Sequence, residues 1–156
     1  MPRYGRVKKR KIGPDSKYQS ELVHKFINKI MWDGQKSKAE KIVYSAMEGA
    51  AEKLKKSPLE IFERAMKNVL PLMEVKPRRV GGATYQIPVE VDSVRARALA
   101  MQWLRQAARS RKGHSMIENL TAELVDAYNG TGGAMNSRET THKAAEANKA
   151  FAHFRW

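Results

Sequence analysis

Apolar residues recur every three or four positions along most of this chain, the spacing that places them on one face of an α-helix. The first such stripe covers residues 22–31, and an Asp-Gly pair typical of a helix end follows it. Two later stripes open with a serine and carry a glutamate three positions on, Ser37 with Glu40 and Ser115 with Glu118, which predicts capping boxes. The pattern predicts six helices, at residues 22–31, 37–54, 57–69, 93–111, 115–129 and 136–154.

Between residues 72 and 91 the apolar period changes to two, the period of a β-strand. Two alternating runs flank Gly81-Gly82, which predicts a protruding two-stranded β-hairpin, or ribbon. Residues that lie directly opposite each other share a face, so pairing Val75 with Val89 fits, whereas a two-residue Gly-Gly loop would oppose apolar to polar positions. We therefore expect a loop of three or more residues, or a bulge. The apolar base of the ribbon should pack on the helices, because two strands alone are marginally stable.

The first eighteen residues have no apolar period, and Gly5, Gly13 and Pro14 break them, so they are predicted to form a basic extended arm. A length of 156 residues favours one domain. The predicted fold is mainly α: a six-helix bundle with a protruding two-stranded β-hairpin and a basic N-terminal arm. The single domain, 1–156, comprises the arm at 1–18, three helices within 19–71, the ribbon at 72–91 and three helices within 92–156.

Positive charge is strongly segregated along the chain. Thirty Lys and Arg face sixteen Asp and Glu, for a net charge of +14. Residues 1–11 carry +6 and residues 76–112 carry +7, so nearly all of the excess lies in these two segments. A merely soluble surface would intersperse the two signs, whereas clustered cations are typical of a footprint for a nucleic-acid backbone.

The helix predicted at 93–111 has one apolar arc and one cationic arc. Leu99, Trp103 and Leu104 lie in the apolar arc, which should face the core. The opposite arc contains no acid, and guanidinium forks suit phosphate oxygens. Its polar members are Arg95, Gln102, Arg105, Gln106, Arg109 and Lys112.

The sequence offers no constellation for catalysis, metal binding or a cofactor. There is no cysteine, the four histidines are scattered, and the carboxylates lie on mixed-charge helix faces. Gly81-Gly82 matches no phosphate-loop motif and is better interpreted as a turn. No apolar run approaches the roughly 18 residues of a membrane span. We expect neither an enzyme nor a small-molecule or membrane binder.

Four aromatic residues allow two interpretations. Tyr85 in the ribbon and Phe151, Phe154 and Trp156 near the end either stack on bases or anchor the last helix. For the C-terminal three, packing is favoured.

Three segments resemble the seventh protein family of the small ribosomal subunit, in its bacterial or organellar form. They are residues 78–91 (RRVGGATYQIPVEV), 98–104 (ALAMQWL) and 145–156 (AEANKAFAHFRW), and residues 26–31 (FINKIM) resemble the first helix of that family. The resemblance implies a structural constituent of the ribosome, in the cytoplasm or an organelle. It implies primary binding to the 3′ major domain of 16S ribosomal RNA and assembly of the 30S head. It further implies messenger RNA and exit-site transfer RNA near the ribbon, and small-subunit proteins nine and eleven as neighbours.

The predicted RNA-contacting residues combine the charge pattern with that resemblance. The ribosomal RNA contacts are Arg3, Arg6, Lys8, Lys9, Arg10, Lys11, Lys36, Lys38, Lys76, Arg78, Arg79, Arg95, Arg97, Gln102, Arg105, Arg109, Arg111, Lys112, Lys143 and Lys149. The residues near messenger or transfer RNA are Arg78, Arg79, Gly81, Gly82 and Tyr85.

Two rival classes remain on physical grounds. A DNA-architectural protein also combines helices with a ribbon and basic arms, and competition between folded RNA and duplex DNA separates the two. An RNA-processing enzyme would need an acid–base pair that the sequence does not offer, and turnover of labelled RNA would reveal it.

Overall fold

The computed structural model describes residues 12–154, so the predicted arm residues 1–11 and the last two residues lie outside the description. Within the described range the chain is mainly helical with one antiparallel hairpin, as predicted. The elements are α1 (Glu21–Ile30), α2 (Lys36–Leu54), α3 (Pro58–Val69), β1 (Met73–Val80), β2 (Ala83–Glu90), α4 (Ser93–Ser110), α5 (Met116–Asn129), α6 (Gly133–Ala147) and a 3-10 helix η1 (Lys149–Phe154).

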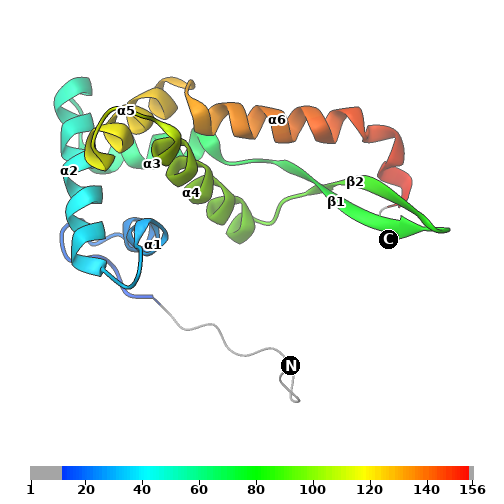
Figure 1. The fold of residues 1–156 in the computed structure, drawn as a ribbon, viewed down its shortest axis with the longest axis horizontal. Coiled ribbons are helices and arrows are strands. Elements are labelled where there is room, and N and C mark those ends of the chain that lie inside the picture. The colour runs from blue at the N-terminus through cyan, green and yellow to red at the C-terminus, as the bar shows by residue number, and fades with distance from the viewer. Residues whose placement is uncertain (1–11, 155–156) are drawn as a thin grey trace, which may run out of the picture.

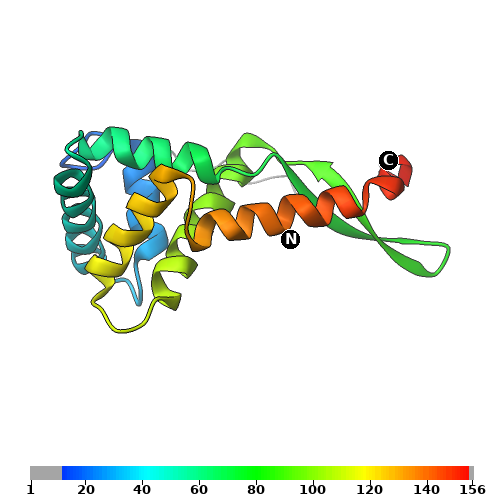
Figure 2. The same cartoon turned by 90° about the horizontal axis from the view of Figure 1, so that it is seen from above.

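Helices α1 to α5 form a compact body at one end of the molecule, while the hairpin and α6 extend from it side by side (Figures 1 and 2). The core of the body is built from the apolar stripes, and α5 packs against α2, α3 and α4. Phe26 and Phe62 are fully buried with ring centroids 5.2 Å apart, and Leu104, Leu120 and Leu124 are also fully buried. The burial of these apolar side chains is the main force that holds the five helices together.

The helix ends follow the predictions in part. The capping box of α5 is present, because Ser115 accepts from the backbone of Glu118 and the Glu118 side chain accepts in return. The box predicted at Ser37 is wrong, since α2 begins at Lys36. Positive φ at Asp33 and Gly34 already turns the chain, and the Lys36 amide donates to the Gly34 carbonyl at 2.8 Å. Ser37 therefore lies inside the first helical turn.

Helix α6 begins at Gly133, three residues before the predicted start. The cause is a partner from another helix: the amide of Ala134 donates to Glu123 Oε1 at 2.8 Å, and Ala134 and Met135 are buried. The α-helix ends at Ala147, after which the chain continues as η1.

The prediction of a hairpin loop of three or more residues, or of a bulge, is wrong. Val80 pairs with Ala83, so Gly81-Gly82 alone forms the loop, and Val75 faces Pro88. Both glycines have positive φ, +56° and +92°. A two-residue hairpin turn whose twist matches that of the flanking strands requires positive φ at both of its central residues. Mixed faces are tolerated because most of the ribbon is exposed; among its described side chains, only Glu74, Ile87 and Pro88 are buried.

Helix α6 and η1 pack against the ribbon, and the tip of the ribbon projects beyond them (Figure 2). The amide of Leu72 donates to His142 Nε2 at 3.0 Å, and the rings of Tyr85 and Phe151 lie 5.2 Å apart. The favoured packing interpretation is thus confirmed for Phe151. The side chain of Phe154 and the whole of Trp156 lie outside the description. The ribbon is held as one rigid projection rather than as an isolated pair of strands.

Candidate nucleic-acid interface

The cationic arc of α4 lies across the end of α1. Arg105 Nη1 donates to the Lys29 carbonyl at 3.3 Å, and Arg109 Nη2 donates to the Ile30 carbonyl at 3.2 Å. Carbonyls in the last turn of a helix lack partners inside the helix and carry its negative dipole end. The two guanidiniums therefore cap α1 and are fixed side by side by these hydrogen bonds.

This arginine pair is electrostatically uncompensated. Burial, and then the positive charge of Arg105, lowers the pKa of Arg109. Among residues 12–154, no carboxylate forms an ion pair with either guanidinium, and the buried Nε of Arg105 has no hydrogen-bond partner. The Arg109 guanidinium also stacks 4.8 Å from the ring centroid of Trp32, which is 66% exposed. An anion placed between the two arginines would relieve their repulsion and satisfy free donors.

Of the two cations predicted at the start of α2, Lys38 lies close to Arg109. Lys38 lines a 170 Å³ cavity together with Arg109 and Trp32. Lys36 is partly compensated, because its ammonium donates to His24 Nε2 at 3.1 Å and lies 3.8 Å from the Glu40 carboxylate. The fold thus brings together residues from α2 and α4 that the sequence separates. Trp32 is an interface candidate that the sequence analysis did not identify. It lies just after the first apolar stripe and belongs to no predicted element, so no local pattern gave it a role.

At the base of the ribbon, two predicted cations share one buried acid. Arg95 Nε donates to both carboxylate oxygens of Glu74, at 2.8 and 2.9 Å, and Lys76 Nζ lies 3.4 Å from the same group. More than half of the Arg95 side chain stays exposed. Glu74 therefore fixes the orientation of two exposed cations and ties β1 to α4.

Arg111, which directly follows α4, has a different environment from Arg105 and Arg109. Its Nε and Nη2 donate to Glu123 Oε2 at 3.0 and 2.6 Å, and Nη2 also pairs with Asp126. Burial by itself lowers the pKa of Arg111, but the bonds and charges of Asp126 and Glu123 outweigh it and raise the pKa overall. The charge of Arg111 is thus compensated inside the protein, although it was predicted to contact RNA.

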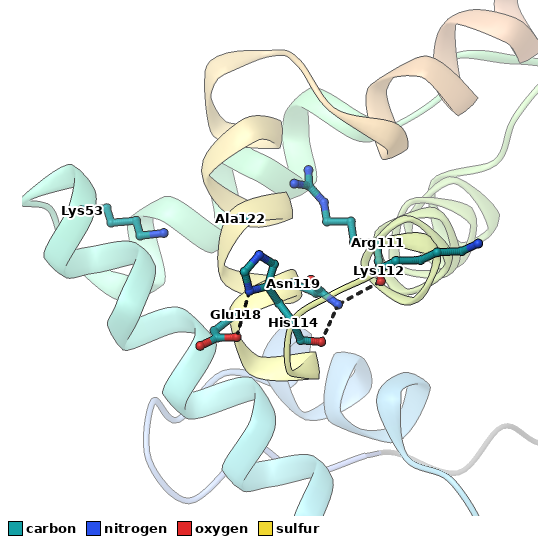
Figure 3. Close-up of a pocket in the computed structure, with 7 residues that line it drawn as sticks. All are labelled: Lys53, Arg111, Lys112, His114, Glu118, Asn119 and Ala122. Carbon is teal, nitrogen blue, oxygen red and sulfur yellow. Dashed lines mark hydrogen bonds and ion pairs between the residues drawn. The ribbon is translucent and has the colours of Figure 1, made fainter.

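The loop between α4 and α5 borders a polar cavity of about 560 Å³ (Figure 3). Asn119 donates to the carbonyls of Arg111 and His114, at 3.1 and 3.3 Å, and His114 lies 3.6 Å from Glu118. These contacts shape the loop. Within residues 12–154 there is also no metal-holding group of three or more His, Asp or Glu, and no helix long and apolar enough to cross a membrane.

The remaining predicted residues are spread over the molecule. Gln102 is half-buried, and Tyr85 is half-buried against Phe151. The arm residues Arg3, Arg6, Lys8, Lys9, Arg10 and Lys11 lie outside the described range. The exposed members are Arg78, Arg79, Gly81, Gly82, Arg97, Lys112, Lys143 and Lys149.

The root of the arm is fixed to the body by Asp15. Its buried carboxylate accepts from the amides of Lys17, Tyr18 and Ser20, at 3.1, 2.8 and 2.8 Å, and from the Tyr44 hydroxyl at 3.2 Å. Burial alone raises the pKa of Asp15, but these four hydrogen bonds lower it, and the net shift is downward. The charged form is therefore the one that the fold stabilises.

We expect Asp15→Asn to lower the free energy of unfolding by about 1 kcal/mol at neutral pH, because bonds to a charged acceptor are replaced by weaker neutral ones. Since the folded-state pKa is depressed, this stabilisation is present above the unfolded-state pKa and is lost as the pH falls through the folded-state value. Urea unfolding of both proteins at neutral and acid pH measures the difference. Asp33→Asn, at an exposed position, is the matched control, and a pH-independent difference would contradict the interpretation.

Comparison with known proteins gives consistent matches over the chain. The sequence model of a family described as "Ribosomal protein S7p/S5e" matches residues 2–149. The chain is 56% identical over 156 residues to small ribosomal subunit protein uS7 of Thermoanaerobacter pseudethanolicus, with all of both chains covered. It is 60% identical over 154 residues to the protein of that name from Chloroflexus aggregans, which covers 99% of this chain and 98% of the relative. It is 59% identical to that of Carboxydothermus hydrogenoformans over the full length of both.

Proposed function

The chain belongs to the ribosomal protein S7p/S5e family, and on this premise we propose that it binds the 3′ major domain of 16S ribosomal RNA and organises assembly of the 30S head. Family membership makes it a structural, non-enzymatic protein of the small ribosomal subunit that binds ribosomal RNA, located on ribosomes in the cytoplasm. The finer assignment to one RNA domain is the proposal.

One observation carries the proposal: Arg105 and Arg109 are fixed side by side at the end of α1 without a carboxylate partner in the described chain. A phosphate that enters this site replaces condensed cations of the RNA, whose release drives binding. Because the helical scaffold holds both guanidiniums before RNA arrives, little side-chain freedom is lost on binding.

The proposed RNA contacts extend in two directions from the pair Arg105 and Arg109. Toward the ribbon they include Arg95, Arg97, Lys76 and the tip, where Arg78 and Arg79 lie near messenger RNA and exit-site transfer RNA. Toward the amino terminus they include the arm. Small-subunit proteins nine and eleven are the proposed protein neighbours. Arg111 supports this surface indirectly, because its hydrogen bonds to Glu123 and Asp126 tie the end of α4 to α5, and Glu123 in turn accepts from the Ala134 amide of α6.

Hydroxyl-radical footprinting on isolated 16S RNA tests the proposed domain. We expect protection confined to the 3′ major domain, and loss of most of it with Arg105→Gln and Arg109→Gln combined. Protection centred in the 5′ or central domain would contradict the assignment, even if binding itself is tight.

We expect removal of residues 1–11 to weaken RNA binding severalfold without unfolding the body. The segment carries +6, and the slope of log affinity against log salt should become shallower by about 0.7 to 0.9 for every phosphate that the arm neutralises. Filter binding across a salt series gives the slope, and thermal unfolding monitors the body. A large drop in the thermal midpoint would show that the arm is structural.

A further inference from the structure

A groove of about 460 Å³ runs between α1 and the first half of α4, next to the arginine pair. Its apolar lining comes from Ile12, Val94, Ala98 and Met101. Val94 is 58% exposed, although valine normally packs inside, whereas Met101 belongs to the core and is only 3% exposed. The volume lies in the usual range for ligand pockets, about 300 to 1,000 Å³. The apolar lining is therefore open to a ligand.

The rim of the groove is cationic and polar. Lys25, Lys29, Arg97 and Asn28 line it, and none of its lining residues is acidic. Among the residues described, Lys29 and Arg97 have no ion-pair partner, while Lys25 lies 3.5 Å from Glu21. An apolar lining with positive charges above it complements a flat, apolar group that carries a phosphate. The amide of Asn28 offers both a donor and an acceptor.

The groove and the arginine pair form one continuous surface. Lys29 contributes its side chain to the groove and its carbonyl to Arg105. Along α4, Met101 and Arg105 are four residues apart, which is about 6 Å on the same helix face. A phosphate bound by Arg105 and Arg109 would therefore place the adjoining nucleotide within reach of the apolar lining.

We propose that this groove binds an unstacked nucleobase of single-stranded RNA whose phosphate lies against Arg105 and Arg109. The inference rests on the proposed RNA-binding function and adds a base-dependent contact to it. Bases inside a duplex have both faces covered, so only a looped or single-stranded nucleotide can enter. The base packs against Val94 and Ala98, and the Asn28 amide contacts the base edge.

The test compares two RNA-like ligands on the full chain. One is an oligouridylate, and the other is a ribose-phosphate oligomer of equal length that lacks bases, so that both carry the same phosphates. We expect the base-bearing oligomer to bind about tenfold more tightly than the oligomer without bases. A tenfold gain in affinity is at the low end of what a small apolar group contributes on entering a hydrophobic pocket. Val94→Ser removes an apolar wall and Ala98→Leu fills the groove, and each should abolish most of that preference. Fluorescence anisotropy measures the affinities.

Leu72→Ser is the matched control, since Leu72 is 70% exposed and lies at the ribbon base, outside the groove. It should retain the preference, and thermal unfolding confirms that each variant is folded. Equal wild-type affinity for the two oligomers, or an undiminished preference in both groove variants, would overturn the base site. If the wild-type chain still bound the 16S transcript, that outcome would leave the proposed function intact. Failure to bind either oligomer or the transcript would overturn both.

Discussion

Replacing Glu123 by alanine is expected to destabilise the protein by about 3 kcal/mol, as breaking a buried ion pair commonly does. Glu123 is fully buried and has three roles at once: it pairs with Arg111, caps α6 through the amide of Ala134, and lies against the glycine joint between α5 and α6. Its loss leaves the Arg111 charge with Asp126 alone and removes the carboxylate that accepts from the Ala134 amide. The thermal midpoint should fall by about 8 °C.

The joint between α5 and α6 is packed closely against Glu123 and Asp126. Gly132 has φ +96°, and a Cβ added there would lie 2.9 Å from Asp126 Cβ and 3.0 Å from Glu123 Oε1. The backbone of α6 therefore approaches the carboxylate as closely as glycine allows. Helix α6 in turn supports the ribbon, so Glu123 contributes to holding the projection in place.

Urea unfolding measures the effect of Glu123→Ala against two comparisons. Glu123→Gln keeps an acceptor for Ala134 but loses the charge, and it should be destabilised less. Glu139→Ala removes an exposed carboxylate from α6 and should change stability by less than about 0.5 kcal/mol. A change of that small size for Glu123→Ala itself would contradict a structural role for the cluster.

Arg105→Glu combined with Arg109→Glu is expected to weaken RNA binding by at least about thirtyfold, since an arginine bound to nucleic acid contributes roughly 1 to 3 kcal/mol. The salt slope should also fall by about 1.4 to 1.8, for two phosphate contacts. Repulsion between the new carboxylates and the α1 carbonyls should lower the thermal midpoint, so binding is measured well below it.

A matched charge reversal separates this local effect from net charge. Lys55→Glu with Lys67→Glu changes the formal charge equally at exposed positions of the α2 terminus and α3. Filter binding should show a much smaller loss for this control. Equal losses in the two double variants would remove the arginine pair from the site and leave only long-range electrostatics.

The sequence predicted the elements that local pattern determines. The capping box of α5 and the position of the hairpin depend on residues close together in the chain, and they were predicted correctly. In the apolar arc of α4, Leu104 is buried as predicted, whereas Leu99 and Trp103 are half-buried. The start of α6 was wrong because the amide of Ala134 is satisfied by Glu123, which is on another helix. No local signal marks such a partner.

Charge alone also could not assign roles to individual arginines. Arg109 and Arg111 look equivalent in sequence, yet Arg109 lies over Trp32 without an acid while Arg111 pairs with two. The predicted pairing of Val75 with Val89 was also wrong, because Val75 faces Pro88. Alternation predicts register only where one face is buried, and here the mostly exposed ribbon lets the Gly81-Gly82 turn decide.

The central claim is that cations held on this helical scaffold bind the phosphates of ribosomal RNA. Its most direct test is a titration of the full chain against a 16S 3′ major-domain transcript and a duplex DNA of equal charge, over a series of salt concentrations. We expect tighter binding to the transcript at every salt concentration, with log affinity falling linearly with log salt. Absence of transcript binding in dilute buffer, or equal affinity for the DNA, would contradict it.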